Sequence, residues 1–143
     1  MQITYNELKQ AVLGSGPMGI IIASILAEKY DSITLWIPDK EFVELLKKRR
    51  QTEIMGKTIE LPDHIEIVSS LDSFGRDDWA FHVAVPSRSF LDSVHGLIEV
   101  LEPFNSYVFS FLTKGILDSK NRKKTGFCHL FTILTKLFTR TQF

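Results

Sequence analysis

The chain contains a single cysteine, no excess of charge of either sign and no apolar run long enough to span a bilayer. Cys128 therefore has no partner for an internal disulfide, and the four histidines are scattered without the spacing of metal ligands. Because 17 basic residues balance 17 acidic ones, charge does not indicate a nucleic-acid partner. Residues 1–5 lack the charged and apolar regions of a signal peptide. We expect a cytoplasmic protein without a metal ion, a nucleic-acid partner or a membrane span.

A glycine-rich segment, Gly14-Ser15-Gly16-Pro17-Met18-Gly19, lies between two apolar runs. Its G-x-G-x-x-G spacing predicts a tight turn at Gly14, close approach of a phosphate to the backbone at Gly16, and close helix packing at Gly19. Pro17 suits the first helical turn, where its missing N–H costs nothing. The exposed amides and the positive helix end would bind a diphosphate, with Ser15 placed to donate a hydrogen bond to it.

This motif is weak by itself, because glycine-rich turns without a ligand are common. Its context strengthens it: residues 11–13 read as a strand end, residues 19–29 as a helix and residues 32–37 as a β-branched, apolar strand. Together they form one βαβ unit of about 30 residues, the length expected around a dinucleotide-binding turn. The sequence therefore favours dinucleotide binding over a structural turn.

Strands and helices alternate through the rest of the chain. We expect a helix over 40–50 with a solvated basic end, a loop over 52–62, a strand over 64–68, a short helix or turn over 71–78, a strand over 79–85, a helix capped by Ser87 that ends near Pro103, and a strand over 107–112. This alternation, in a chain long enough for one domain, predicts a Rossmann-type doubly wound parallel sheet of the α/β class. Ligands of such sheets bind beyond the carboxyl ends of the strands, where loops 14–19, 85–89 and 112–115 would meet.

Five segments in order resemble the N-terminal domain of NAD(P)-dependent glycerol-3-phosphate dehydrogenase. They are the GSGPMG turn, Leu35-Trp36 at the second strand, Leu61-Pro62 followed by Ile65, Val85-Pro86-Ser87, and Thr113-Lys114-Gly115. The resemblance covers residues 8–117. Reductases of ketopantoate or 6-phosphogluconate type share the sheet, but the T-K-G segment argues against them.

The resemblance implies a dinucleotide-binding domain over residues 1–117 and hydride transfer between glycerol-3-phosphate and dihydroxyacetone phosphate. Lys114 would lie near the nicotinamide and the substrate phosphate, and is the one catalytic candidate; otherwise it is a solvated loop lysine. The implied cofactor contacts are Gly14, Ser15, Gly16, Pro17, Met18, Gly19, Pro38, Asp39, Val85, Pro86 and Lys114.

Two segments depart from the family pattern. Asp39 favours NAD over NADP at the ribose, but the same carboxylate suits a cap for the next helix. The family continues into a helical C-terminal domain that carries the acid/base lysine, whereas residues 118–143 here are basic and then rich in Phe and Leu. We interpret that tail as a closing helix or an altered terminus.

The missing acid/base group leaves open whether the chain alone is an enzyme. We expect cofactor binding with little turnover; the alternative is a non-catalytic dinucleotide-binding module or remnant subunit. A sheet domain without its second domain would expose apolar surface, so we also expect the tail or a second copy, in a homodimer, to cover it.

Overall fold

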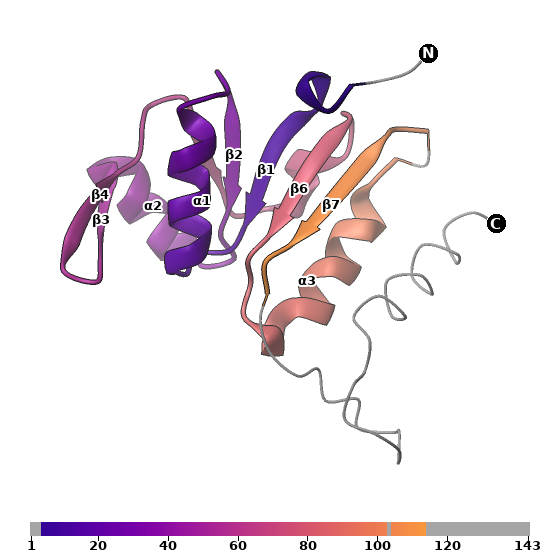
Figure 1. The fold of residues 1–143 in the computed structure, drawn as a ribbon. Coiled ribbons are helices and arrows are strands. Elements are labelled where there is room, and N and C mark those ends of the chain that lie inside the picture. The colour runs from indigo at the N-terminus through magenta and orange to yellow at the C-terminus, as the bar shows by residue number, and fades with distance from the viewer. Residues whose placement is uncertain (1–3, 103, 114–143) are drawn as a thin grey trace.

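Five parallel strands form the central sheet of the computed structural model, which describes residues 4–102 and 104–113 (Figure 1). Their spatial order is β5-β2-β1-β6-β7. The strands are β1 (Lys9–Leu13), β2 (Ile33–Trp36), β5 (Ile65–Val68), β6 (Trp79–Val83) and β7 (Tyr107–Phe111). The predicted parallel α/β sheet is therefore confirmed, with each expected strand present to within about two residues, the usual uncertainty of element ends.

Helices cover both faces of this sheet. Helices α1 (Pro17–Ala27) and α2 (Lys40–Arg49) follow β1 and β2, while the 3-10 turn η2 (Leu71–Phe74) and helix α3 (Ser87–Val100) precede and follow β6. The chain moves outward from β1 to β5 in one direction and from β6 to β7 in the other. Because crossovers between parallel strands are right-handed, the two directions place their helices on opposite faces.

Side chains along each strand alternate between two separate hydrophobic cores, one on each face of the sheet. Val12 of β1 points toward α1, whereas Ala11 and Leu13 point toward α3. The α1 side is aliphatic, and the α3 side is rich in rings, with Phe74, Trp79, Phe81 and Phe90 among its members. Burial of both faces explains why Trp79–Val83 reads as a continuous apolar run instead of an alternating one.

A β-hairpin replaces the loop expected over 52–62. Strands β3 (Gln51–Ile54) and β4 (Lys57–Glu60) pair antiparallel beside α2. Met55 and Gly56 between them have φ angles of 51° and 74°, the pattern of a type I′ turn. The loop prediction was wrong because Met55 occupies a position where Asn or Asp is the usual signal, and because only Ile54 and Ile59 of the short strands reach the core.

Helix α3 begins one residue earlier than predicted. Ser87 is its first helical residue and Pro86 is the N-cap, so the predicted Ser87 cap was wrong. Pro86 has the extended ψ of 147° that a cap residue needs, and no side chain caps this helix. None of the helices within residues 4–102 and 104–113 has the length and apolar character needed to cross a membrane.

A small polar cluster lies at the amino end of the sheet on the α1 side. Gln10 of β1 is 1% exposed and donates through its amide nitrogen to the Leu8 carbonyl at 3.1 Å. Its Oε1 lies 3.0 Å from His82 Nε2 of β6, and the Tyr5 hydroxyl lies 3.3 Å from the same ring nitrogen. Burial lowers the pKa of His82 below its ordinary value.

Candidate functional site

The carboxyl edge of the sheet contains a topological switch point between β1 and β6. The arrows labelled β1, β2, β6 and β7 point toward this edge, where α1 and α3 also begin (Figure 1). The turn after β1 and the loop after β6 are joined to the sheet there: Gly14 N donates to Trp36 O at 3.0 Å, and Ala84 N donates to Leu13 O at 2.8 Å. Crevices at such points are the usual ligand sites of open α/β sheets.

Gly14 and Gly19 are required by the fold itself. Gly14 has a φ of +133°, and a Cβ there would lie 2.6 Å from the Ala84 carbonyl oxygen. A Cβ on Gly19 would overlap the Gly14 carbonyl oxygen and lie 2.9 Å from its carbon. The tight turn predicted at Gly14 is present, and Gly19 allows the helix to begin directly against that turn.

Gly16 differs from both neighbouring glycines. Its backbone angles of −71° and 172° suit any residue, and no atom of the described residues lies within 4 Å of the place where a Cβ would be. Gly16 is the N-cap of α1, a position that glycine suits better than alanine, but neither its backbone angles nor the packing of the described residues requires a glycine there. What remains is access from outside, since the missing side chain leaves the backbone open to a close neighbour.

The starts of α1 and α3 differ from the start of α2. Asp39 Oδ1 caps α2 by accepting from Phe42 N at 3.0 Å, so the capping interpretation of Asp39 is confirmed. Neither α1 nor α3 has a side-chain cap or an acidic residue in its first turn. The positive ends of these two helices lie on either side of the switch point and would favour a negatively charged group there.

The first amides of α1 are correspondingly open. The helical hydrogen bonds of α1 start with Ile20 N, which donates to Gly16 O at 3.1 Å. Pro17 has no N–H, and the amides of Met18 and Gly19 find no acceptor within residues 4–102 and 104–113. Open amides at a positive helix end bind phosphate and carboxylate groups.

Four further predicted residues also lie at this edge. Pro38 and Asp39 are exposed at the end of β2, Val85 is buried just after β6, and Pro86 is exposed. Lys114, like the rest of the tail, lies outside the described residues. Thr113 had no role in the sequence prediction beyond its place in T-K-G, yet its hydroxyl donates to Val85 O at 2.8 Å and ties the end of β7 to the loop after β6.

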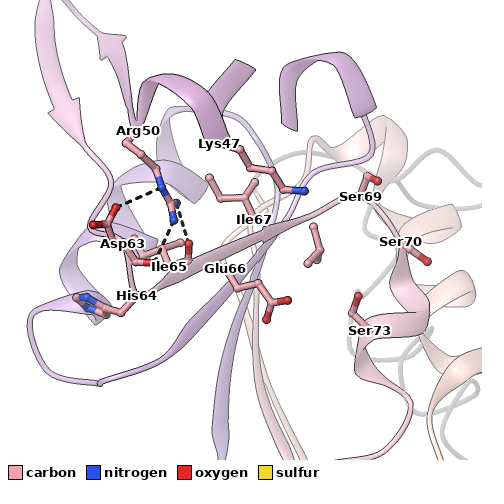
Figure 2. Close-up of a pocket in the computed structure, with 11 residues that line it drawn as sticks. Lys47, Arg50, Asp63, His64, Ile65, Glu66, Ile67, Ser69, Ser70 and Ser73 are labelled. Carbon is pink, nitrogen blue, oxygen red and sulfur yellow. Dashed lines mark hydrogen bonds and ion pairs between the residues drawn. The ribbon is translucent and has the colours of Figure 1, made fainter. Parts of the chain in front are cut away.

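A second hollow, of about 530 Å³, runs along the outer edge of β5 (Figure 2). Arg50, in the left-handed conformation after α2, donates from Nη1 to Ile65 O at 2.9 Å and from Nη2 to Asp63 O at 3.0 Å. Lys47, on the same wall, is paired with Glu44 at 3.3 Å. None of the residues predicted to hold a cofactor lines this hollow. Within the described part of the chain, no group of three His, Cys, Asp or Glu side chains is arranged to hold a metal ion.

Comparison with known proteins gives a consistent result. A family model described as NAD-dependent glycerol-3-phosphate dehydrogenase N-terminus matches residues 9–138, which extends beyond the segment over which the sequence motifs carry the resemblance. The glycerol-3-phosphate dehydrogenase [NAD(P)+] of Halorhodospira halophila is 32% identical over 120 residues, covering 83% of this chain and 33% of that protein.

Solved structures support the fold. The glycerol-3-phosphate dehydrogenase of Coxiella burnetii superposes with a TM-score of 0.64 at 18% identity, over 76% of this chain and 33% of that one. The Plasmodium falciparum enzyme gives a TM-score of 0.65 at 23% identity, over 80% of this chain and 34% of that one. The chain thus spans about a third of the length of the relatives that it matches. It belongs to the NAD-dependent glycerol-3-phosphate dehydrogenase family and corresponds to that family's N-terminal region.

Proposed function

We propose that this chain binds a nicotinamide dinucleotide, NAD in preference to NADP, at the turn between β1 and α1. It would do so as the cofactor-binding part of an enzyme that interconverts glycerol-3-phosphate and dihydroxyacetone phosphate. The observation that carries this proposal is Gly16, whose backbone is open although no clash or strain among the described residues requires a glycine there. The uncapped amides of Met18 and Gly19 beside it supply donors for a diphosphate.

The residues at the carboxyl edge divide between the two halves of the dinucleotide. Gly14, Ser15, Gly16, Pro17, Met18 and Gly19 would surround the diphosphate, with Pro38 and Asp39 at the adenosine ribose and Val85, Pro86 and Lys114 toward the nicotinamide. Only Oδ1 of Asp39 is used by the helix cap, so Oδ2 is available to accept from a ribose 2′-hydroxyl. The same carboxylate would repel a 2′-phosphate, which supports NAD over NADP.

The bound cofactor would supply or accept the hydride. Formation or loss of the alcohol also needs a proton carrier within hydrogen-bond reach of the substrate oxygen. Lys114 is the candidate from this chain, through its position in T-K-G and its charge, which would favour a phosphorylated substrate. We propose that the main acid/base group belongs to the other two thirds of a full-length enzyme, and that this chain alone binds cofactor with little turnover.

Calorimetric titration of the purified chain with NADH and with NADPH tests this proposal. We expect saturable heat with both and a lower Kd for NADH. Addition of dihydroxyacetone phosphate should then produce little oxidation of NADH. Robust turnover would place the acid/base group within this chain and direct attention to Lys114. The absence of heat with either dinucleotide would contradict the proposal.

Exposed apolar side chains also support self-association. Met18 and Ile25 of α1 are 43% and 56% exposed, and Val108 of β7 is 44% exposed. Isolated apolar residues on a surface are ordinary, but side chains on elements at the α1 side of the sheet favour a further layer there. We propose a homodimer through this side. Light scattering over a range of concentrations should give twice the chain mass, and a monomer at high concentration would contradict it.

A further inference from the structure

Strand β7 lies at the edge of the sheet beside α3 and presents a row of aromatic rings on that side (Figure 1). Tyr107, Phe109 and Phe111 of this row pack on the ring-rich core, yet each is only partly buried. Phe109 stacks on Phe111 with ring centroids 5.9 Å apart, and Phe111 meets Phe90 of α3 at 5.6 Å. Among the described strands only β6 pairs with β7. The row therefore lies at the border of the α3-side core.

Helix α3 adds two aliphatic side chains beside this row. Gly96 of α3 faces η2, because a Cβ there would meet Leu71 Cδ1 at 3.0 Å. Leu91 and Ile98 lie about 150° around the helix from Gly96, at 3.6 residues per turn. They therefore face away from η2 and toward β7, and both are partly buried against the same core. We define the apolar strip as these two side chains and the ring row: Leu91, Ile98, Tyr107, Phe109 and Phe111.

The sequence that follows β7 contains a segment suited to this strip. Within residues 127–138, six apolar residues have the spacing of one helix face: Phe127, Leu130, Phe131, Leu134, Leu137 and Phe138. His129, Thr132 and Lys136 would fall on the opposite face. As a helix this segment would be about 18 Å long, at 1.5 Å per residue. The 5 residues of β7 span about 17 Å, so the two lengths match.

The connection permits this placement and selects the face. The chain leaves β7 at the carboxyl edge of the sheet, where the Thr113 hydroxyl donates to Val85 O at 2.8 Å. Residues 114–126 would reach about 43 Å if fully extended, at 3.3 Å per residue, more than twice the length of β7. A right-twisted strand followed by a right-handed helix packs back onto its sheet in a right-handed sense. Such a turn from β7 leads to the α3 side, as the parallel unit β6-α3-β7 already does.

We propose that residues 127–138 form an amphipathic helix that docks on the apolar strip of their own chain. Because residues 114–126 hold this segment close to the strip, its effective concentration there exceeds that of a separate molecule. This favours the chain's own segment over a second copy as the occupant. The proposal does not rest on cofactor binding, and it leaves the exposed Met18 and Ile25 on the α1 side for self-association.

Cys128 allows a direct test, because it is the one cysteine of the chain and would lie beside the apolar face of the helix. A nitroxide label on Cys128 broadens the resonances of nearby amides in the ¹⁵N-labelled 143-residue chain, measured without cofactor. We expect strong loss of intensity at Leu91, Ile98 and residues 107–111, and none in the β3–β4 hairpin. Broadening concentrated on α1, or no selective broadening, would overturn the proposal.

A mixed sample distinguishes the chain's own segment from that of a second copy. Spin-labelled chain at natural isotope abundance is mixed with unlabelled ¹⁵N chain, so that any broadening must come from another molecule. We expect the apolar strip to keep its intensity in this sample. Broadening of the strip there would identify a second copy as the occupant and overturn the proposal.

A matched pair of variants tests the apolar face of the segment. Leu134→Asp places a charge at the centre of that face, whereas Thr132→Asp places the same charge on the opposite face. We expect the selective broadening of the strip to disappear in spin-labelled Leu134→Asp and to persist in spin-labelled Thr132→Asp. Equal broadening in the two variants would contradict docking through this face. The measurement on the native chain decides the proposal if a variant fails to fold.

Discussion

Alanine substitutions at the three glycines of the turn after β1 should distinguish residues needed for stability from a residue needed for cofactor binding. At Gly16 an alanine Cβ meets no atom within 4 Å, and the backbone conformation is ordinary. Gly16→Ala should therefore change the free energy of unfolding by less than about 1 kcal/mol, because the lower conformational entropy of the unfolded chain and the loss of glycine at the α1 N-cap act in opposite directions. The same methyl group would project over the open amides, and should weaken NADH binding tenfold or more, equivalent to about 1.4 kcal/mol.

Gly19→Ala is the matched control. Its Cβ would overlap the Gly14 carbonyl oxygen, which is backbone and cannot move aside without opening the turn. We expect a loss of stability of about 1–3 kcal/mol or more, the usual cost of overpacking. Gly14→Ala combines a similar clash, with Ala84 O at 2.6 Å, with a φ of +133° that alanine disfavours. Both controls should lose binding only together with stability.

Two measurements on each variant decide the matter. Urea denaturation followed by circular dichroism gives the free energy of unfolding, and calorimetric titration with NADH gives the Kd. We predict a Gly16→Ala variant whose free energy of unfolding stays within about 1 kcal/mol of the parent value and whose Kd for NADH is higher. A folded Gly16→Ala variant with the parent Kd would refute the placement of the diphosphate at this turn.

Three further changes test other parts of the structure. Burial lowers the pKa of His82, so the unfolded chain takes up a proton before the folded chain as the pH falls below about 6.5. The free energy of unfolding should therefore decrease below that pH and stay level above it. Urea denaturation between pH 5 and pH 8 should show a weaker pH dependence for His82→Gln than for the parent chain. Asp39→Ala should lower the free energy of unfolding by about 1 kcal/mol because it removes the α2 cap, whereas Asp39→Asn should keep most of that stability. Asp39→Asn should also bring the Kd values for NADPH and NADH closer together. An unchanged ratio of the two Kd values would argue against Asp39 at the ribose. Thr113→Val should cost about 1 kcal/mol by removing the hydrogen bond to Val85 O, while Thr58→Val on the exposed hairpin should leave the urea midpoint almost unchanged.

Periodicity and turn chemistry were sufficient to predict the sheet and most of its helices. The β-branched run at 33–36 and the apolar run at 79–83 are buried on both faces, so their composition alone identifies them as strands. The hairpin over 51–60 was missed because its exposed side chains carry little apolar pattern and because Met55, instead of Asn or Asp, precedes Gly56 in its turn.

The candidate site was only partly accessible to sequence reasoning. The motif located the three glycines. It did not show that a Cβ at Gly14 or Gly19 would clash with neighbouring backbone, whereas a Cβ at Gly16 would meet none of the described atoms. In the sequence, Asp39 suits a helix cap and a ribose contact equally well. The structure shows that its Oδ1 accepts from Phe42 N and so caps α2. The role of Lys114 stays a prediction, because it lies outside the described residues.

The position of Arg50 bears on the resistance of the sheet edge to aggregation. A sheet that ends in an unpaired strand offers a template on which another polypeptide can add its own strand, which is a common beginning of fibrous aggregates. By occupying the carbonyls of Asp63 and Ile65, the guanidinium interrupts that template along β5. We therefore expect Arg50, which lies away from the proposed cofactor turn, to make strand addition at this edge of the sheet less favourable.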